Sequence, residues 1–432
     1  MNQPINQDKS LNRDQEFDSP DTLSETKRCL ACFEEGVEEF LNLGKTALAN
    51  QFIQENKLGV PTPEFPLRLG FCANCGMVQL MDLADPPEMF SHYLYISSVS
   101  STLKDHLSEL AHTLCQKYSL NGQHFAVDIG SNDGTLLAAF QSNEVRILGV
   151  DPASNLVSLA SEKNIETMNA FFGEESARKI LEQYGPANII TATNVFQHIP
   201  DQRDMLRGLD ILLAENGVFV FESHYLQDMV EQCAFDTVYH EHVFYFSILP
   251  LRRHFHRHGF RIVDVERLPI HHGQIRVTVV RDSSPIQTNE RVMQLEADEK
   301  AKGYHTIKPF LQFAKQANKC RSQLVDLINS LLQQGKRIAA YGAPAKGNTL
   351  LASCDLSSNQ LIYIVDRSPL KQGLFTPGTH IPIVPVEKLK TDPTDFLLIL
   401  AWNFVEEITA QLQWYSNSGG RFILPVPVPK II

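Results

Sequence analysis

The chain has 432 residues, of which 43% are hydrophobic, and its formal net charge at pH 7 is −12. This length suggests about three domains, and the acidic balance argues against a general nucleic-acid-binding protein, which would present a basic surface. No apolar run approaches the roughly 20 residues needed to cross a bilayer, so we expect no membrane segment.

Residues 1–26 are polar and lack the apolar core of a secretory signal. Their composition predicts a disordered tail. Without a signal we expect a cytoplasmic protein, in which thiols stay reduced and paired cysteines indicate a metal site rather than a disulfide.

Four cysteines form two CxxC pairs, Cys29 with Cys32 and Cys72 with Cys75. Two such turns complete a tetrahedral zinc site, and a closed site of four thiolates is structural because it has no open position for chemistry. The second pair lies in LGFCANCGMVQL, which is typical of a strand, a knuckle turn and a second strand. We therefore predict a small zinc-binding domain at residues 27–84, with a redox CxxC as the alternative. The remaining cysteines are expected to be ordinary buried residues: Cys115, Cys233, Cys320 and Cys354.

The stretch QHFAVDIGSNDGTLLAAF predicts a strand, a glycine turn and an apolar helix. Asp128 closes this strand, and a second strand ends at Asp151, 23 residues later. An acidic residue at this spacing suits hydrogen bonding to ribose hydroxyls. Buried strands follow in ANIITATNVFQHI and NGVFVFESHY. We expect an open, largely parallel α/β sheet over residues 85–282, with ligands at its carboxyl edge. The candidate cofactor-binding residues there are Asp128, Gly130, Ser131, Asn132, Asp151 and Asn194.

The glycine turn discriminates between cofactors. A dinucleotide site requires G-x-G-x-x-G, whereas this turn reads G-S-N-D-G and carries Asp133. S-adenosylmethionine has no phosphate and a positive sulfonium, so an acidic loop favours it over a dinucleotide. The alternatives are a dehydrogenase and an α/β sheet without this cofactor.

The motif FDTVYHEHVFYFS follows the strand VFVFES, so we expect it to lie over the carboxyl edge of the same sheet. A histidine beside a carboxylate suits general-base chemistry. Metal binding is less favoured because the H-E-x-x-H spacing is absent, and a structural role is the other alternative. Segment 92–102 could form a helix covering the cleft. The candidate catalytic residues are Tyr93, His198, Tyr239, His240, Glu241 and His242.

Residues 283–432 begin with helical apolar spacing, which predicts one or two linking helices. GKRIAAYGAPAKGNTLLAS then repeats the pattern of strand, glycine loop and helix, and a later strand ends at Asp366. These features indicate a second doubly wound, Rossmann-like sheet that binds a nucleotide, or else a purely structural duplicate. The candidate substrate-binding residues are Lys346, Asn348 and Lys371, since a lysine can meet a phosphate at a helix N-terminus.

Over residues 27 to 425 the chain resembles the nucleotide-sugar C-methyltransferases of deoxysugar pathways. The resemblance rests on both CxxC pairs, DIGSNDGTLL, FDTVYHEHVFYFS, AAYGAPAKGNTLL, VDRSPLKQGLFTPGTHIPI and LAWNF. It implies a zinc-binding domain, a class I S-adenosylmethionine domain and a C-terminal Rossmann-like domain, with the nucleotide-sugar between the last two. It also implies that Tyr239–His242 supplies catalytic groups, with His242 as the favoured base and Tyr93 and His198 as neighbours. If His242 is the base, we expect Glu241 or Tyr239 to orient it.

The activity implied is methylation of carbon in a nucleoside-diphosphate-linked 4-keto-deoxysugar, with an O- or N-methyltransferase or a non-enzymatic scaffold as alternatives. The family often reads H-G-G-S where this chain reads His271-His272-Gly273-Gln274, so the substrate could differ. The sequence indicates no particular oligomeric state.

Overall fold

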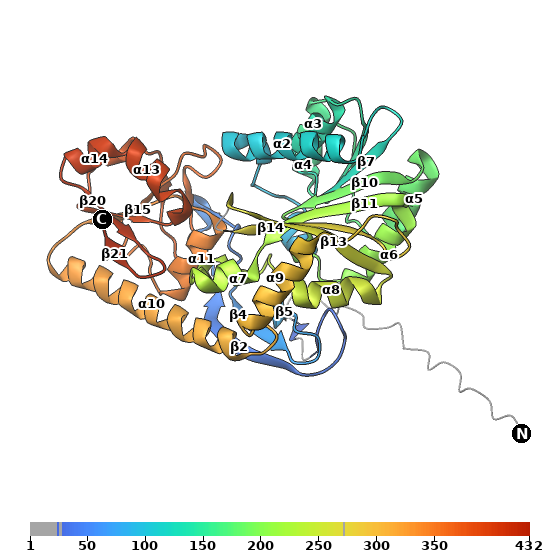
Figure 1. The fold of residues 1–432 in the computed structure, drawn as a ribbon. Helices are drawn as coiled ribbons and strands as arrows, with labels where there is room; N and C mark the ends of the chain where they lie inside the picture. The colour runs from blue at the N-terminus through green and yellow to red at the C-terminus, as the bar shows by residue number, and fades with distance from the viewer. Residues whose placement is uncertain (1–23, 26–27, 271–272) are drawn as a thin grey trace, which may run out of the picture.

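The structure is a computed structural model that describes residues 24–25, 28–270 and 273–432. Its strands form three larger sheets and two two-stranded pairs. Figure 1 shows the three larger sheets next to one another. The predicted disordered tail lies outside the described residues except for β1 (Ser24–Glu25), which pairs with β6 (Asp82–Leu83). Among the helices of the described part, none is both long and apolar enough to span a bilayer.

The N-terminal sheet has the order β12-β5-β4-β2. The predicted strand, turn and strand around the second cysteine pair are confirmed, because Gly76 takes a positive φ of 85° and its N–H donates to the Cys72 carbonyl at 2.8 Å. The outer strand β12 comes from the motif at 235–247 and pairs antiparallel with β5. That motif is therefore attached to the N-terminal sheet. The strands are β2 (Val37–Thr46), β4 (Phe65–Cys72), β5 (Val78–Leu80) and β12 (Phe244–Tyr245).

The central sheet has the order β13-β14-β11-β10-β7-β8-β9 and confirms the predicted α/β class. Five neighbouring strands from β11 to β9 run parallel, and β13 and β14 are antiparallel. The chain proceeds outward from β7 to β9 and returns to place β10 beside β7, a switch point at which open sheets bind ligands. The strands are β7 (Phe125–Ile129), β8 (Arg146–Asp151), β9 (Thr167–Asn169), β10 (Ala187–Thr193), β11 (Leu213–His224), β13 (Phe260–Leu268) and β14 (Gln274–Arg281).

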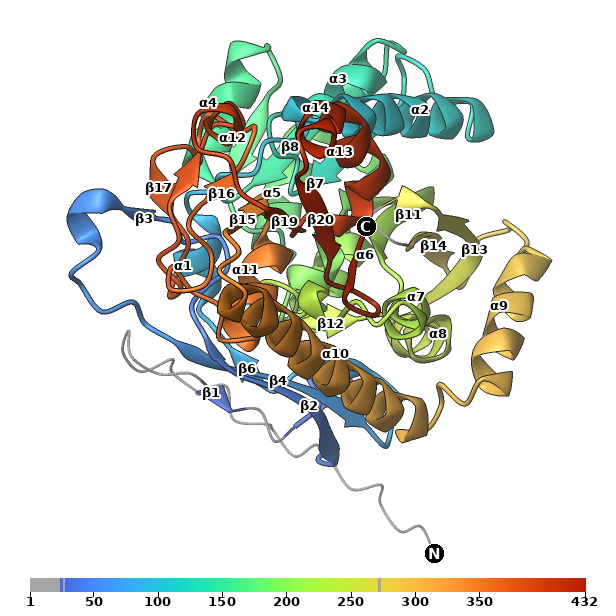
Figure 2. The same ribbon diagram turned by 90° about the vertical axis from the view of Figure 1, so that its left-hand side faces the viewer.

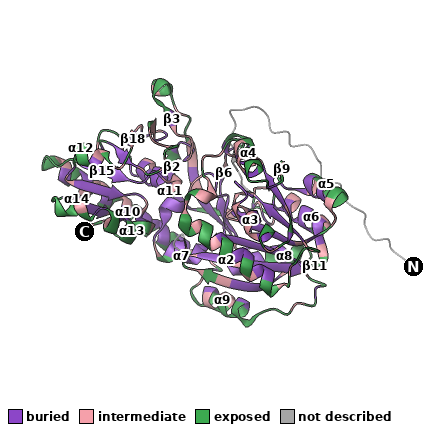
Figure 3. Cartoon of the chain, turned by 90° about the horizontal axis from the view of Figure 1, so that it is seen from above, coloured by how far each residue is buried: buried purple, intermediate pink, exposed green. Residues whose placement is uncertain are grey.

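Helices cover both faces of this sheet, with their exposed residues outward as in Figure 3. One face packs against α2 and α3, and the other against α5, α6 and α8. Polar residues begin two of them, since Ser100 Oγ accepts from the Leu103 N–H and Asp201 accepts from the Asp204 N–H. The helices are α2 (Ser101–Lys117), α3 (Thr135–Gln141), α4 (Ser154–Glu162), α5 (Glu174–Tyr184), α6 (Gln202–Leu212), α7 (Leu226–Glu231) and α8 (Ile248–Arg257).

The C-terminal sheet, β18-β16-β15-β19-β20-β21, is the predicted second doubly wound sheet. Its switch point lies between β15 and β19, which are parallel neighbours. The strands are β15 (Ile338–Tyr341), β16 (Ile364–Val365), β18 (Ile383–Val384), β19 (Phe396–Ile399), β20 (Arg421–Leu424) and β21 (Lys430–Ile431). The helices are α11 (Ala345–Ser353), α12 (Lys388–Thr391), α13 (Val405–Gln411) and α14 (Gln413–Asn417).

The linking segment forms two helices, α9 (Glu290–Ala301) and α10 (Lys308–Gln333), as its spacing predicts. Figure 2 shows α10 crossing β2 and β4 on its way to the C-terminal sheet. Phe310 of α10 packs against Phe40 and Phe71 of the N-terminal sheet, with ring centroids 5.3 and 5.4 Å apart. Further along, Leu324 and Ile328 belong to the same hydrophobic core as the C-terminal strands. One continuous core thus joins the first and last sheets.

Candidate active site

A cavity of about 970 Å³ lies where the carboxyl edges of the central and C-terminal sheets face each other. Its walls are the glycine turn, the segment before α2, the motif at 235–247 and the loops after β15, β16 and β19. The segment 92–102 lines the cavity, but the prediction of a helix over this segment is wrong. Residues 97–99 form one 3-10 turn, and α2 begins only at Ser101, because Ser100 caps it.

Two aspartates lie at the end of the cavity that the glycine turn forms. Asp151 ends β8, and its two carboxylate oxygens each accept a backbone N–H at 2.8 Å, from Asn132 and Ala153. Each oxygen keeps a lone pair for a ligand hydroxyl. Asp128 is buried in β7 and accepts from the Thr191 hydroxyl at 2.6 Å. Burial raises the pKa of Asp128 to about 7, against the lowering effect of that hydroxyl.

The glycine turn requires its first glycine for two reasons. Gly130 has a φ of +64°, which L side chains rarely adopt, and a Cβ on it would lie 2.4 Å from Cγ2 of Val195. The next residues bind the covering segment, since Asn132 Oδ1 accepts from the Ser97 N–H at 2.9 Å and its amide donates to the Tyr95 carbonyl at 3.0 Å. Gly130, Ser131 and Asn132 all line the cavity.

Asp133 does not have the role that the sequence suggested. It is buried outside the cavity lining, where Lys163 Nζ pairs with its carboxylate at 2.6 Å and Thr135 donates to it. Its charge is thus neutralised away from the cavity. Asp133 therefore does not favour a sulfonium cofactor over a dinucleotide at this turn.

The motif at 235–247 is a turn, which separates its side chains. Residues 235–237 form a 3-10 helix, and the His242 N–H donates to the Tyr239 carbonyl at 2.9 Å. Tyr239 and His242 therefore face the cavity. His240 points to the N-terminal sheet, where its Nε2 donates to the Pro66 carbonyl at 3.1 Å. The structure does not bring His240 into the cavity.

His242 is held as a neutral imidazole with one defined tautomer. Its Nδ1 lies 2.8 Å from the carbonyl oxygen of Thr237, and since a carbonyl only accepts, Nδ1 carries the proton and Nε2 carries the lone pair. Burial lowers the pKa of His242 well below its usual range, and nearby His198 lowers it further. The orienting partner is thus a backbone carbonyl, whereas the sequence suggested Glu241 or Tyr239. The Tyr239 ring instead packs on the imidazole, with centroids 4.0 Å apart.

Glu241 lies behind the cavity wall and receives two hydrogen bonds. The Tyr93 hydroxyl donates to one carboxylate oxygen at 2.8 Å, and the Asn50 amide donates to the other at 2.6 Å. Burial raises the pKa of Glu241 to about 7, although both donors lower it. Tyr93 and Asn50 line the cavity themselves. Sequence reasoning missed Asn50, because 191 positions separate it from Glu241.

Three histidines gather at the centre. His198 stacks between Phe90, in α1 (Pro86–Phe90), and His242, with centroids 5.6 and 5.1 Å apart. Burial lowers the pKa of His198 to about 3, so it is neutral near pH 7. His224, at the end of β11, lies 4.8 Å from the His242 ring centroid. Sequence reasoning missed His224, although its position at the carboxyl end of VFVFES was a usable signal.

Two lysines of the C-terminal domain line the opposite wall. Lys346 lies 4.3 Å from the ring centroid of Trp402 and donates to Asn403 at 2.5 Å. Burial lowers the pKa of Lys346 to about 8, and Asp236 opposes this. Lys371 donates to the Ala343 carbonyl at 2.7 Å, and burial lowers its pKa too. Asn348 does not line the cavity, because its buried amide donates to the Ala49 carbonyl at 2.7 Å.

Polar contacts outside the cavity also hold the motif at 235–247 and the carboxyl edge of the central sheet. Asp236 is fully buried, and its carboxylate accepts from the Trp402 indole N–H at 2.6 Å. Asn194, which lines the cavity, accepts from the Gln274 amide at 2.7 Å. The His271-His272 part of the family departure lies outside the described residues, while Gln274 acts through Asn194.

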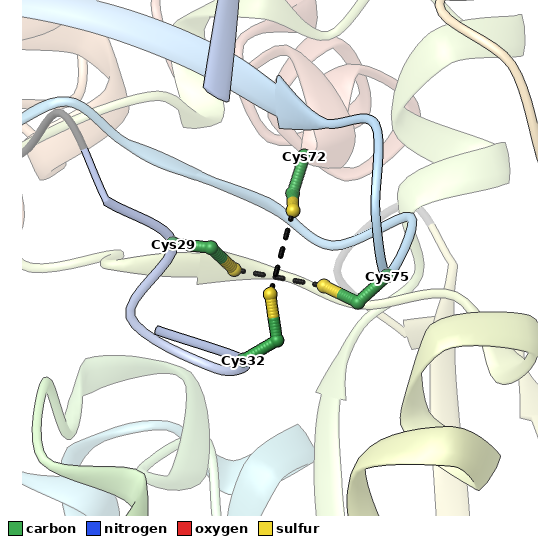
Figure 4. Close-up of side chains that lie close together, drawn as sticks. All are labelled: Cys29, Cys32, Cys72 and Cys75. Atoms are coloured by element: carbon green, nitrogen blue, oxygen red, sulfur yellow. Dashed lines mark hydrogen bonds between the residues drawn. The ribbon is translucent and has the colours of Figure 1, made fainter. Parts of the chain in front are cut away.

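The four paired cysteines converge as predicted (Figure 4). Their sulfurs all lie within 4.8 Å of one another, and the pairs Cys29–Cys75 and Cys32–Cys72 are 3.5 and 3.6 Å apart. Zn–S bonds of about 2.3 Å in a tetrahedron place neighbouring sulfurs about 3.8 Å apart, so the cluster fits this ion. The other four cysteines are buried and free, as predicted.

Three family models match successive parts of the chain. They are described as "Putative zinc binding domain" over residues 29–90, "Methyltransferase domain" over residues 103–265 and "C-methyltransferase C-terminal domain" over residues 269–427. The predicted domain boundaries at 84 and 282 stay predictions.

The chain is 32% identical to the C-methyltransferase NovU of Streptomyces niveus, over 95% of this chain and 98% of that protein. Solved structures that resemble part of it include an S-adenosylmethionine-dependent methyltransferase of Anabaena variabilis (18% identity, 39% of this chain, 82% of that chain, TM-score 0.31). Another is magnesium protoporphyrin IX methyltransferase of Synechocystis (15% identity, 41% of this chain, 83% of that chain, TM-score 0.32). By its match to NovU and to the three models, the chain belongs to the nucleotide-sugar C-methyltransferase family of deoxysugar biosynthesis, and it is an S-adenosylmethionine-dependent C-methyltransferase with a structural zinc site.

Proposed function

We propose that the enzyme methylates a carbon next to the ketone of a nucleoside-diphosphate-linked 4-keto-deoxysugar, with His242 as the base. The observation that carries the proposal is the neutral His242, whose Nε2 lone pair lies on a cavity wall between the glycine turn and two lysines. Adenosine would bind along Gly130–Asn132, with its ribose on Asp151 and with Asp128 and Asn194 nearby. Its methyl group would then point toward the histidines.

S-adenosylmethionine supplies an electrophilic methyl group, so the protein must generate a carbon nucleophile. Nε2 of His242 would remove the proton next to the ketone, and the electrons of that C–H bond would form an enolate. The enolate carbon would take the methyl group as the S–CH3 bond breaks, which leaves S-adenosylhomocysteine and re-forms the ketone. Burial disfavours a charged His242, but its positive charge arises together with the negative enolate, and the two charges offset that cost. The Thr237 carbonyl holds the ring throughout.

The enolate oxygen needs a donor, and the cavity offers candidates. Tyr239 lines the cavity beside the base. The Tyr93 hydroxyl already donates to Glu241, so it can donate to the enolate only if this hydrogen bond is exchanged. His198 and His224 lie in the same ring cluster as His242. We assign Tyr239 as the first donor, with Tyr93 and Glu241 as a linked pair behind it.

The diphosphate would lie against Lys346 and Lys371. Both lysines line the cavity on the side of the C-terminal domain, and they follow the two strands β15 and β16 next to the switch point. Lys346 also belongs to the first turn of α11, where N–H groups favour an anion. These features support a nucleotide-linked substrate rather than a free sugar.

The proposal is tested by turnover with methyl-labelled S-adenosylmethionine against a panel of nucleotide-linked 4-keto-deoxysugars and their unlinked sugars. We expect label in product only with linked sugars, on a ring carbon as located by carbon NMR. Label on oxygen, or equal turnover of the free sugars, would contradict the proposal. The zinc-loaded full chain is the enzyme used.

A further inference from the structure

The loop between β2 and β3 (Ile53–Gln54), residues 47–52, leaves the N-terminal sheet and runs between the other two domains. On one side, Asn50 donates to the Glu241 carboxylate at 2.6 Å, and on the other, the Ala49 carbonyl accepts from Asn348 at 2.7 Å. The Phe52 ring lies 5.1 Å from Nζ of Lys371. This interdomain loop therefore contacts the catalytic motif and both basic segments of the substrate wall.

The loop is fixed at both ends. At its start, β2 belongs to the N-terminal sheet, whose β4 ends at the zinc-ligand candidate Cys72. At its far end, β3 pairs with β17 (Leu374–Phe375) of the C-terminal domain, and Figure 2 shows these two strands side by side. A tight turn lies between β2 and β3, where the Gln51 N–H donates to the Leu48 carbonyl at 3.0 Å. The position of Asn50 is thus set by segments of two domains, while Glu241 lies on the turn that precedes β12.

We infer that Asn50 is a positioning residue through which the N-terminal zinc-binding region holds the Glu241 carboxylate toward the Tyr93 hydroxyl. The inference rests on the proposed function of the cavity. It gives the zinc-binding region a part in the reaction that its closed cysteine site cannot perform. Asn50 fixes one carboxylate oxygen, so the other faces Tyr93 at 2.8 Å.

The groups around Glu241 determine how the loss of the Asn50 amide would change the pKa of Glu241. The Tyr93 phenol faces the carboxylate from another segment, and Tyr239, His240 and His242 lie on the same turn as Glu241. Among the described residues no cation forms an ion pair with Glu241, so the Asn50 amide and the Tyr93 hydroxyl are the groups that favour its charged form. Removing Asn50 therefore raises the pKa of Glu241 above about 7, and the carboxylate becomes protonated as pH falls through that higher value.

The test compares Asn50→Ala and the isosteric Asn50→Asp with the wild type. Its matched control is Asn42→Ala, which removes an exposed asparagine from β2, the strand that precedes the loop. Carbon NMR of the ¹³C-carboxyl glutamates, with Glu241 assigned by Glu241→Gln, follows its titration in the S-adenosylmethionine-bound protein. We expect both Asn50 variants to titrate at higher pH and the control to match the wild type. Equal midpoints in all proteins would overturn the inference.

Turnover gives a second readout. The acid limb of kcat/KM should move to higher pH in both Asn50 variants, and turnover below pH 7 should fall about tenfold, the usual effect of one hydrogen bond to a charged group. An unchanged limb would also overturn the inference. If no linked sugar is turned over by the wild type, the proposed function fails, whereas the carboxylate titration needs no sugar and still decides the role of Asn50.

Discussion

Substituting Gly130 by alanine should weaken S-adenosylmethionine binding in a way that the structure quantifies. The residue has a φ of +64°, and the added Cβ would lie 2.4 Å from Cγ2 and 3.1 Å from Cγ1 of Val195. The left-handed backbone costs about 1–2 kcal/mol, and forcing an extra methyl into a packed site costs about 1–3 kcal/mol. The total is about 2–5 kcal/mol.

The turn can relieve the clash only by moving, and the next residues, Ser131 and Asn132, move with it. We therefore expect Gly130→Ala to weaken binding at least tenfold, since a tenfold change corresponds to about 1.4 kcal/mol. Calorimetric titration with S-adenosylmethionine measures the dissociation constant. Thermal unfolding of the unliganded protein measures the loss of stability that remains after the turn has moved.

Two further variants separate strain from clash. In Gly130→Ala/Val195→Ala both Val195 methyls are gone and the nearest remaining atom is its Cβ at 3.3 Å, so affinity should partly recover. Gly185 has a φ of 84° and a ψ of −176°, which L side chains rarely adopt, and nothing lies within 4 Å of an added Cβ. Gly185→Ala should therefore lower stability by about 1–3 kcal/mol and leave affinity unchanged. The reasoning is refuted if Gly130→Ala matches the wild type in both affinity and stability, or if the double variant recovers nothing.

Four other outcomes are expected. His242→Gln should lower methyl transfer by about 10²–10⁴-fold, the usual contribution of a general base, with S-adenosylmethionine affinity unchanged in calorimetry; turnover within threefold of wild type would reject the base. Affinity for a nucleoside diphosphate should fall as pH rises through about 8, where Lys346 loses its proton. Lys346→Arg should reduce that fall, and Lys371, whose pKa burial also lowers, accounts for the part that remains. A flat wild-type profile would show that Lys346 does not bind the diphosphate. Trp402→Phe leaves the buried Asp236 carboxylate without its 2.6 Å donor and should cost about 2–3 kcal/mol, seen as a lower melting temperature; unchanged melting would contradict the importance of this bond. Chelation of zinc should release one equivalent to a metal-sensitive dye and lower turnover, although no cysteine lines the cavity. Full activity after complete release would show that the zinc site does not support the structure of the active site.

Local patterns determined much of this protein. The two CxxC pairs predict the cysteine cluster because each turn fixes two thiols on its own, and the strand pattern of LGFCANCGMVQL is confirmed by β4 and β5. The strands that end in Asp128 and Asp151 predict a polar edge, since the carboxyl ends of parallel strands meet on one side of a sheet. Both doubly wound sheets were predictable for the same reason.

Side-chain direction within turns was not predictable. His240, Glu241 and His242 are consecutive, yet one faces the Pro66 carbonyl, one faces Asn50 and one lines the cavity. Neither a helical nor a strand period separates them in this way, because these residues form a turn, whose dihedral angles follow neither period.

Tertiary contacts alone decided the remaining features, because they join residues far apart in the chain. Lys163 pairs with Asp133, and the Asn348 amide donates to the Ala49 carbonyl. Asn50 donates to Glu241, which lies 191 positions away in the chain. The sequence by itself determined which residue types lie at each sheet edge, through the local alternation of apolar strands and glycine turns. Which of those residues face the cavity was decided by the packing of three domains on one another, since a buried polar group must find its partner wherever the fold brings one.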